Sequence, residues 1–325
     1  MEAVMSNIYA GVDLGGTTAK LGLLTDEASL IRKWEIPTRK DDGGKQVIPD
    51  IAASIKKNIE EEGIRFSELA GAGLGVPGPI RQDGYLEVCV NIGPGMRDMN
   101  PVKDLSGLLG GIPVKGGNDA NVAALGEMWQ GGGKGYRDVV AVTLGTGVGG
   151  GVILDGHIVA GSKGMGGEIG HMVMDWDWKE PEVCNCGNRG CLEQIASATG
   201  IARHARIFMR ENDRPSVLRN LQRVTARDVF DAAKAGDGLA EDVADYCMMY
   251  LARAMAYVSQ VVDPEIFVIG GGVSKAGQYL LDLIKKHYDP LIKLTRGKAK
   301  LALARLGNDA GIYGAAKMVI DEREK

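Results

Sequence analysis

The sequence has no excess of basic residues and no long apolar run. Its 325 residues include 38 Lys and Arg against 42 Asp and Glu, a formal net charge of −4. Proteins that bind nucleic acid or anionic membranes usually carry a basic excess, so we expect neither partner. Apolar stretches such as residues 139–142 are far shorter than the roughly 20 residues that span a bilayer. Residues 1–9 lack the features of a secretory leader, and we expect a cytoplasmic protein.

Cysteine is also scarce. The five cysteines are an odd number, and three of them lie within eight positions of one another. Crowding of this kind favours a reducing compartment and a metal site over a disulfide framework. Three thiolates and one imidazole form the closed donor set of a structural Zn²⁺ site. The sequence therefore predicts zinc bound by His171, Cys184, Cys186 and Cys191.

Zinc on one ring nitrogen of His171 would leave the other nitrogen for a substrate hydroxyl. Glu168 lies three residues before this histidine, and Glu193 lies two residues after Cys191. Carboxylates beside metal ligands are good acceptors for paired sugar hydroxyls, although solvated surface glutamates are the simpler interpretation.

Glycine, in contrast, is abundant, with 48 residues. One glycine turn comprises Asp13, Gly15, Gly16, Thr17 and Thr18, and a second runs over residues 144–151, each after an apolar strand pattern. Glycine permits positive φ and close approach of backbone N–H groups to a ligand. One such turn is most simply a tight hairpin, whereas two favour phosphate binding, with Asp13 holding a hydrated cation.

No P-loop pattern occurs in the chain. Residues 145–150 match G-x-G-x-x-G, but a dinucleotide motif opens a helix, and here residues 151–156 read as a strand. We therefore reject dinucleotide binding and expect two hairpins to hold phosphates, with Mg²⁺ offsetting their charge.

Asn118 and Asp119 come directly before a predicted helix over residues 120–130. Capping of that helix is the simpler explanation for either residue. The functional alternative makes Asp119 the base that accepts a proton from a substrate hydroxyl, with Asn118 binding a neighbouring hydroxyl.

Hydrophobic patterns predict three strands over residues 8–12, 19–24 and 29–37 in an antiparallel meander, a helix over 48–62 and a strand over 70–76. A similar order recurs over residues 139–280, with helices over 239–262 and 275–287, the latter capped by Ser274. A last helix is expected from Asn308 or Asp309 to about Ile320. The pattern predicts a duplicated α/β plan, with a seam near residues 116–118.

These motifs together resemble the ROK (repressor, open reading frame, kinase) family of sugar kinases over about residues 9–317. The matching segments are residues 13–17, 75–79, 118–127, 144–151, 164–171 and the zinc signature C-x-C-G-x-x-G-C-x-E at 184–193. The resemblance implies an actin-like (ribonuclease H-like) ATPase fold with two α/β domains and an active-site cleft between them. We place the smaller domain at residues 1–117, joined by the C-terminal helix at 308–325, and the larger, zinc-binding domain at 118–307.

The resemblance also implies ATP-dependent phosphorylation of a hexose, with Asp119 as the base, and a homodimer. Residues 33–38, 184–187 and 197–200 are most similar to the glucokinase branch from Gram-positive bacteria. The expected sugar contacts are Asn118, Asp119, Glu168, His171, Glu193 and Gly78. The expected nucleotide contacts are Asp13, Gly15, Gly16, Thr17, Thr18, Lys20, Gly145, Thr146, Gly147, Gly271 and Gly272.

Two alternatives remain open. Another hexose (N-acetylglucosamine, N-acetylmannosamine, mannose or fructose) suits the same chemistry, and ADP or polyphosphate suits the same phosphate turns. A sugar-sensing repressor is less favoured, because only about a dozen residues precede Asp13, too few for a helix-turn-helix domain.

The chain departs from the family pattern in two places. Many relatives carry Asn and then Trp in the sugar-side loop, whereas this loop has Asn91 and places Met96 near the Trp position. An insert before the cysteines contains Trp176 and Trp178, whose rings we expect to pack on the zinc loop rather than on a sugar.

Overall fold

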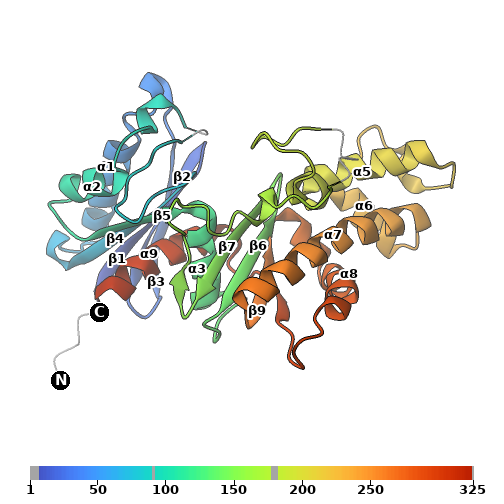
Figure 1. The fold of residues 1–325 in the computed structure, drawn as a ribbon. Helices are drawn as coiled ribbons and strands as arrows, with labels where there is room; N and C mark the ends of the chain where they lie inside the picture. The colour runs from blue at the N-terminus through green and yellow to red at the C-terminus, as the bar shows by residue number, and fades with distance from the viewer. Residues whose placement is uncertain (1–6, 90–91, 177–181, 324–325) are drawn as a thin grey trace. The chain divides into compact units, whose positions relative to one another are not determined.

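The computed structural model describes residues 7–89, 92–176 and 182–323 (Figure 1). These residues form two compact units. The first comprises residues 1–135, 151–167 and 306–325, and the second comprises residues 136–150 and 168–305. The domain limits expected from the family resemblance stay a prediction.

The sheet of the first unit has the order β3-β2-β1-β4-β5. Its strands are β1 (Ile8–Leu14), β2 (Thr18–Thr25), β3 (Leu30–Pro37), β4 (Leu69–Val76) and β5 (Val114–Asn118). β1, β2 and β3 pair antiparallel, as the predicted meander requires, while β4 pairs parallel with β1 and with β5.

Both faces of this sheet are covered. Ile8, Ala10 and Val12 belong to the core cluster that also contains α1 (Val47–Glu61) and α2 (Pro101–Leu108), whereas Tyr9 packs with α9 (Ala310–Arg323). This alternation follows from the two-residue period of a strand. The other odd positions of β1 are Gly11 and Asp13, and a Cβ on Gly11 would lie 2.1 Å from the Ile312 carbonyl oxygen, so α9 lies directly against the strand.

The helix α3 (Asp119–Gln130) packs on α9. Glycine makes this crossing close: a Cβ on Gly126 would lie 2.1 Å from the carbonyl oxygen of Ala310, and one on Gly314 would lie 1.7 Å from that of Val122. Backbones that approach this closely leave room for no larger residue at either position.

The second sheet has the order β10-β9-β6-β7-β8. Its strands are β6 (Val139–Leu144), β7 (Val148–Leu154), β8 (His157–Ile158), β9 (Ile266–Gly270) and β10 (Lys300–Leu303), and the boundary between the units falls inside β7. β9 pairs parallel with both β6 and β10.

The helices of the second unit are α4 (Leu192–Ala196), α5 (Ala198–Glu211), α6 (Ala226–Lys234), α7 (Gly238–Val262) and α8 (Gln278–Tyr288). Thr225 and Asp228 form a capping box at the start of α6. The predicted start of α8 was wrong. Ser274 lies in a 3₁₀ turn (Gly272–Ala276) and its hydroxyl donates to the Gly271 carbonyl at 2.7 Å, so α8 begins only after Gly277, whose φ is +73°.

No helix in the described residues is long and apolar enough to cross a membrane.

Candidate active site and metal centre

Asp119 is the first residue of α3, at the carboxyl end of β5. Its Oδ1 accepts a hydrogen bond of 2.8 Å from the Ala120 N–H. The carboxylate therefore stands at a helix N-terminus, where backbone N–H groups and the helix dipole favour its negative charge.

Asn118 caps the same helix. Its Oδ1 accepts from the N–H groups of Ala120 (3.0 Å) and Asn121 (3.2 Å), and its Nδ2 donates to the Gly78 carbonyl at 3.2 Å. With the carbonyl oxygen occupied twice, one Nδ2 hydrogen remains for a ligand. Gly78, at φ +117°, lies beside Asn118, so the structure brings Gly78, Asn118 and Asp119 together in the first unit.

The first glycine turn joins β1 to β2 in this unit. The N–H of Gly15 donates to the Thr18 carbonyl at 3.0 Å, and Thr38 Oγ1 donates to the Gly15 carbonyl at 2.8 Å. The expectation of positive φ was wrong for both glycines of this turn, Gly15 and Gly16. Glycine is favoured at position 15 for a steric reason instead, because a Cβ there would lie 2.9 Å from the Thr18 carbonyl oxygen.

Asp13 pairs across the hairpin with Lys20 and lies against the start of α9, where a Cβ on Gly311 would be 2.5 Å from the Asp13 Cγ. Burial raises the pKa of Asp13, and the charge of Lys20 opposes this rise. A carboxylate that burial disfavours gains most from a bound cation, so the residue fits the predicted role of holding hydrated Mg²⁺.

The second glycine turn joins β6 to β7. The carbonyl of Gly145 accepts from the Ala198 N–H at 2.8 Å, and the carbonyl of Thr146 accepts from Thr199 Oγ1 at 2.7 Å. On the other side, Glu193 Oε2 accepts from the Val148 N–H at 3.0 Å. The segments before and after the turn are thus fixed by α4 and α5.

Gly271 lies beside this turn, at the end of β9. Its φ is +83°, and a Cβ there would lie 2.4 Å from the Leu144 carbonyl oxygen, so only glycine fits. Gly272 lines a pocket of about 560 Å³ in the second unit, within the size range of small-molecule sites. Its other lining residues come from 198, 225–231 and 273–276, including Phe230, Arg227 and Lys275.

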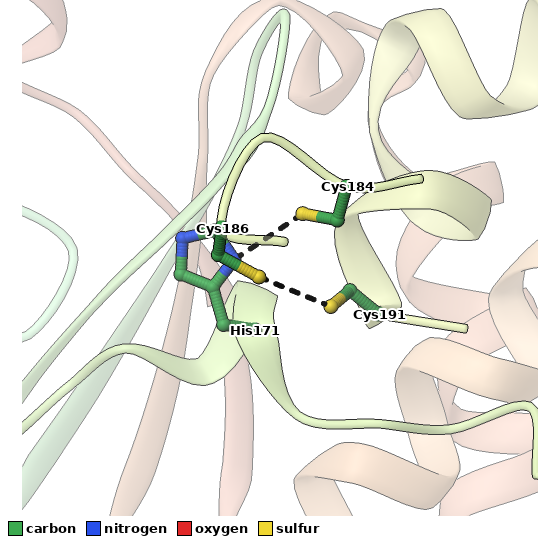
Figure 2. A group of neighbouring side chains, drawn as sticks. All are labelled: His171, Cys184, Cys186 and Cys191. Carbon is green, nitrogen blue, oxygen red and sulfur yellow. Dashed lines mark hydrogen bonds between the residues drawn. The ribbon is translucent and has the colours of Figure 1, made fainter. Parts of the chain in front are cut away.

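The predicted zinc ligands come together in the second unit (Figure 2). His171 Nδ1 lies 3.6 Å from Cys184 Sγ, and Cys186 Sγ lies 3.6 Å from Cys191 Sγ. All four donor atoms lie within 4.8 Å of one another. Zinc bonds of about 2.3 Å to sulfur and 2.0 Å to nitrogen place the corners of a tetrahedron about 3.6–3.8 Å apart, so the residues fit Zn²⁺.

The environment of the thiols differs within this cluster. Burial raises the pKa of Cys184 and of Cys191, both of which are almost inaccessible to solvent. The pKa of Cys186 is lowered, because hydrogen bonds from the Asn188 backbone and the neighbouring thiols outweigh the effect of burial. A thiol that ionises readily is a good first ligand for a metal cation.

The second nitrogen of His171 faces away from the thiols. Its Nε2 lies 3.8 Å from Glu168 Oε2, and both side chains are partly exposed. The ring therefore has Nδ1 on the side of the thiols and Nε2 near Glu168, and the binding of a substrate hydroxyl by Nε2 stays a prediction.

Glu193 is more constrained than the sequence indicated. Besides its bond to Val148, its Oε1 lies 3.8 Å from Cys184 Sγ. A Cβ on Gly147 would lie 2.0 Å from Oε2, so a larger residue in the turn would displace the Glu193 side chain. Glu193 thus links the metal cluster to the second glycine turn, a contact that no sequence pattern signalled.

Two departures from the family pattern can be placed. Met96 is buried at 1% exposure in the core of the first unit, where it supports the loop. Trp176 is 73% exposed, so the expected packing on the zinc loop is wrong for this ring. Asn91 and Trp178 lie outside the described residues.

The predicted site residues form two groups. Gly78, Asn118, Asp119 and the first glycine turn belong to the first unit, and the metal ligands, Glu168, Glu193, Gly271 and the second glycine turn belong to the second. Thr38 and Thr199, which fix the two turns, were missed because a lone threonine hydroxyl carries no motif of its own.

The ROK family model matches residues 9–322, which include both groups of predicted site residues. A protein of Halalkalibacterium halodurans named glucokinase is 45% identical over 96% of this chain and 94% of its own length.

Two solved structures are similar in fold. The ROK hexokinase of Thermus thermophilus has a TM-score of 0.81, with 31% identity over 98% of this chain and 99% of that one. The ROK family glucokinase of Streptomyces griseus, solved with glucose and AMPPNP, has a TM-score of 0.72, with 30% identity over 96% of this chain and 99% of that one. The chain belongs to the ROK family.

Proposed function

We propose that this protein is a glucokinase that transfers the γ-phosphoryl group of ATP to the 6-hydroxyl of glucose. The observation that carries the proposal is the 45% identity to a glucokinase over nearly the whole of both chains. The solved glucokinase with bound glucose and AMPPNP, 30% identical, supports the same sugar and the same donor.

In this mechanism Asp119 accepts the proton of the 6-hydroxyl as its oxygen attacks the γ-phosphorus. The Ala120 N–H holds the Asp119 carboxylate at the N-terminus of α3, in position to act as a base. The remaining Nδ2 hydrogen of Asn118 donates to a neighbouring hydroxyl, and Glu168, Glu193 and His171 Nε2 bind others.

The two glycine turns bind the phosphates through their N–H groups and so stabilise the charge of the transferring group. Asp13 and Lys20 are the charged residues of the first turn. Mg²⁺, when bound near Asp13, neutralises phosphate charge. The pocket at Gly272 is our candidate for the adenosine, and Phe230, Arg227 and Lys275 are among the residues that line it.

Zinc has a structural role in this proposal. Held by His171, Cys184, Cys186 and Cys191, it fixes the loop that carries His171 and the start of α4, and it leaves the proton transfer to Asp119. The homodimer that the family resemblance implies remains an expectation.

A panel of sugars and phosphoryl donors tests the proposal. We expect kcat/KM with ATP to be at least tenfold higher for glucose than for N-acetylglucosamine, N-acetylmannosamine, mannose or fructose, and higher with ATP than with ADP or polyphosphate. A different preferred sugar would keep the kinase and reject the glucokinase, whereas no turnover with any hexose would reject both.

A further inference from the structure

The segment Ser197-Ala198-Thr199-Gly200 has no part in the proton and phosphoryl transfer described above, yet it contacts the second glycine turn directly. At the start of α5, the Ala198 N–H donates to the Gly145 carbonyl at 2.8 Å. The next residue, Thr199, donates from Oγ1 to the Thr146 carbonyl at 2.7 Å. Two consecutive carbonyl groups of the turn are therefore bound to the first turn of one helix.

These two bonds fix the direction of two N–H groups. In a trans peptide the C=O and the following N–H point in opposite directions within one plane. The N–H of Thr146 therefore points away from Ala198, and the N–H of Gly147 points away from Thr199. Neither N–H donates a hydrogen bond within the described part of the chain. Two adjacent N–H groups turned outward in this way favour an anion.

The Thr199 hydroxyl is itself held in place. Its Oγ1 lies 3.0 Å from Oγ of Ser197, which is fully buried and caps α5 by accepting from the Gly200 N–H at 3.0 Å. Since Ser197 supplies the cap, the Thr199 hydroxyl is not needed to begin the helix. We therefore relate the position of the Thr199 hydroxyl to its hydrogen bond with the Thr146 carbonyl.

We propose that Thr199 is a positioning residue for phosphoryl transfer, whose hydroxyl holds the 146–147 peptide so that the N–H groups of Thr146 and Gly147 bind the nucleotide's phosphates. The proposal rests on the proposed function. Without the hydroxyl, the Thr146 carbonyl has no fixed donor and the peptide is free to rotate, which weakens the interaction with phosphate but not the interaction with sugar.

The test compares Thr199→Val, which removes the hydroxyl and keeps the shape, with Thr199→Ser, which keeps the hydroxyl. Loss of one hydrogen bond of this kind predicts a roughly three- to tenfold fall of kcat/KM for ATP in T199V. We expect T199S to stay within about twofold of wild type, by the same reasoning. Glucose affinity, measured by calorimetry without nucleotide, is expected to be unchanged in both.

Thr295→Val is the matched control. Thr295 also donates from its hydroxyl to a backbone carbonyl, that of Gly297 at 2.5 Å, in an exposed loop of the same unit. T295V should retain wild-type kinetics. Wild-type values of kcat/KM for T199V, or an equal loss in T199S and T199V, would overturn the assignment of Thr199.

A binding measurement separates this proposal from the proposed function. Affinity for a non-hydrolysable ATP analogue should fall by a similar factor in T199V, whichever sugar the protein phosphorylates. If the wild-type protein phosphorylated no hexose, the proposed function would fail, and the analogue affinities of T199V and T295V would still decide the role of Thr199.

Discussion

At the scale of single residues, burial of the Asp13 carboxylate disfavours its negative charge, so a bound cation would stabilise it. Its folded-state pKa lies above the ordinary value of 3.8, so the native protein binds this proton more tightly than the unfolded chain. As pH rises from 3.8 through the folded pKa, ionisation of Asp13 therefore lowers the free energy of unfolding.

The substitution Asp13→Asn removes the free-energy cost of ionising this buried carboxyl group. Without Mg²⁺ and nucleotide, the variant should have a higher free energy of unfolding than wild type at pH 7, and the difference should shrink as pH falls toward 3.8. Urea denaturation across this range measures it. Asp83→Asn, at an exposed carboxylate paired with Arg81, should show no such pH-dependent gain. A D13N protein less stable than wild type at pH 7 would contradict the account.

The sequence predicted the residues with a local signature. Asn118 followed by Asp119 indicated a helix start, and the structure has Asn118 as the cap of α3. Ser274 had an equally good capping pattern, but a 3₁₀ turn formed there because its hydroxyl bonds backward to Gly271. Local chemistry alone does not decide between these two outcomes.

At the scale of elements, the candidate zinc loop at residues 184–191 is closed by a turn in which the Cys184 N–H donates to the Asn188 carbonyl at 2.8 Å. The purified protein should contain about one zinc per chain, the stoichiometry of a closed four-ligand site. Cys186→Ser should lose the metal and lower the thermal midpoint of unfolding, because metal binding contributes to folding.

Elemental analysis measures the zinc content, and thermal unfolding measures the change in the midpoint. Cys186 is exposed, so its substitution disturbs no packing. Cys247→Ala, at a buried cysteine of α7 outside the cluster, should keep full zinc content. Wild-type protein without zinc, and with stability unaffected by a chelator, would exclude the metal centre.

The crossing of α3 and α9 gives a second element-scale prediction. Gly126→Ala places a Cβ 2.1 Å from the Ala310 carbonyl oxygen, far inside contact distance, so the helices must separate. The free energy of unfolding should fall by about 1–3 kcal/mol, the usual cost of overpacking.

Gly107→Ala is the control for this prediction. Gly107 lies in α2 with no atom within 4 Å of an added Cβ, so alanine should raise stability by up to about 1 kcal/mol. Denaturant unfolding compares the two variants. Equal effects of G126A and G107A would show that the crossing is not tightly packed.

Elements with a clear period were predicted from the sequence. The meander of β1, β2 and β3 and the long helix α7 follow from alternating and helical patterns of apolar residues. The helix α2 and the strand β10 were missed, because α2 is a short helix that contains Gly107 and β10 has four residues. Such elements owe their structure to their neighbours in the fold.

At the scale of the whole molecule, the site residues are spread from Asp13 to Gly272 along the chain. Composition and spacing predicted the candidate metal ligands and the two glycine turns, since each of these has a local pattern. The family resemblance assigned these residues and Asp119 to one phosphoryl-transfer reaction. The bonds from Glu193 to Val148 and from Thr199 to Thr146 needed the structure, because they connect residues 45 and 53 positions apart.

In the proposed mechanism, Asp119 is the base that accepts the proton of the glucose 6-hydroxyl. Asp119→Asn keeps the shape of the side chain and removes its basicity, so kcat for glucose phosphorylation should fall by roughly 10²–10⁴-fold while glucose affinity, measured by calorimetry, stays within a fewfold of wild type. Asp104→Asn is the matched control, since Asp104 is also in the first turn of a helix, α2. A D119N protein with the turnover of D104N and wild type would contradict the claim.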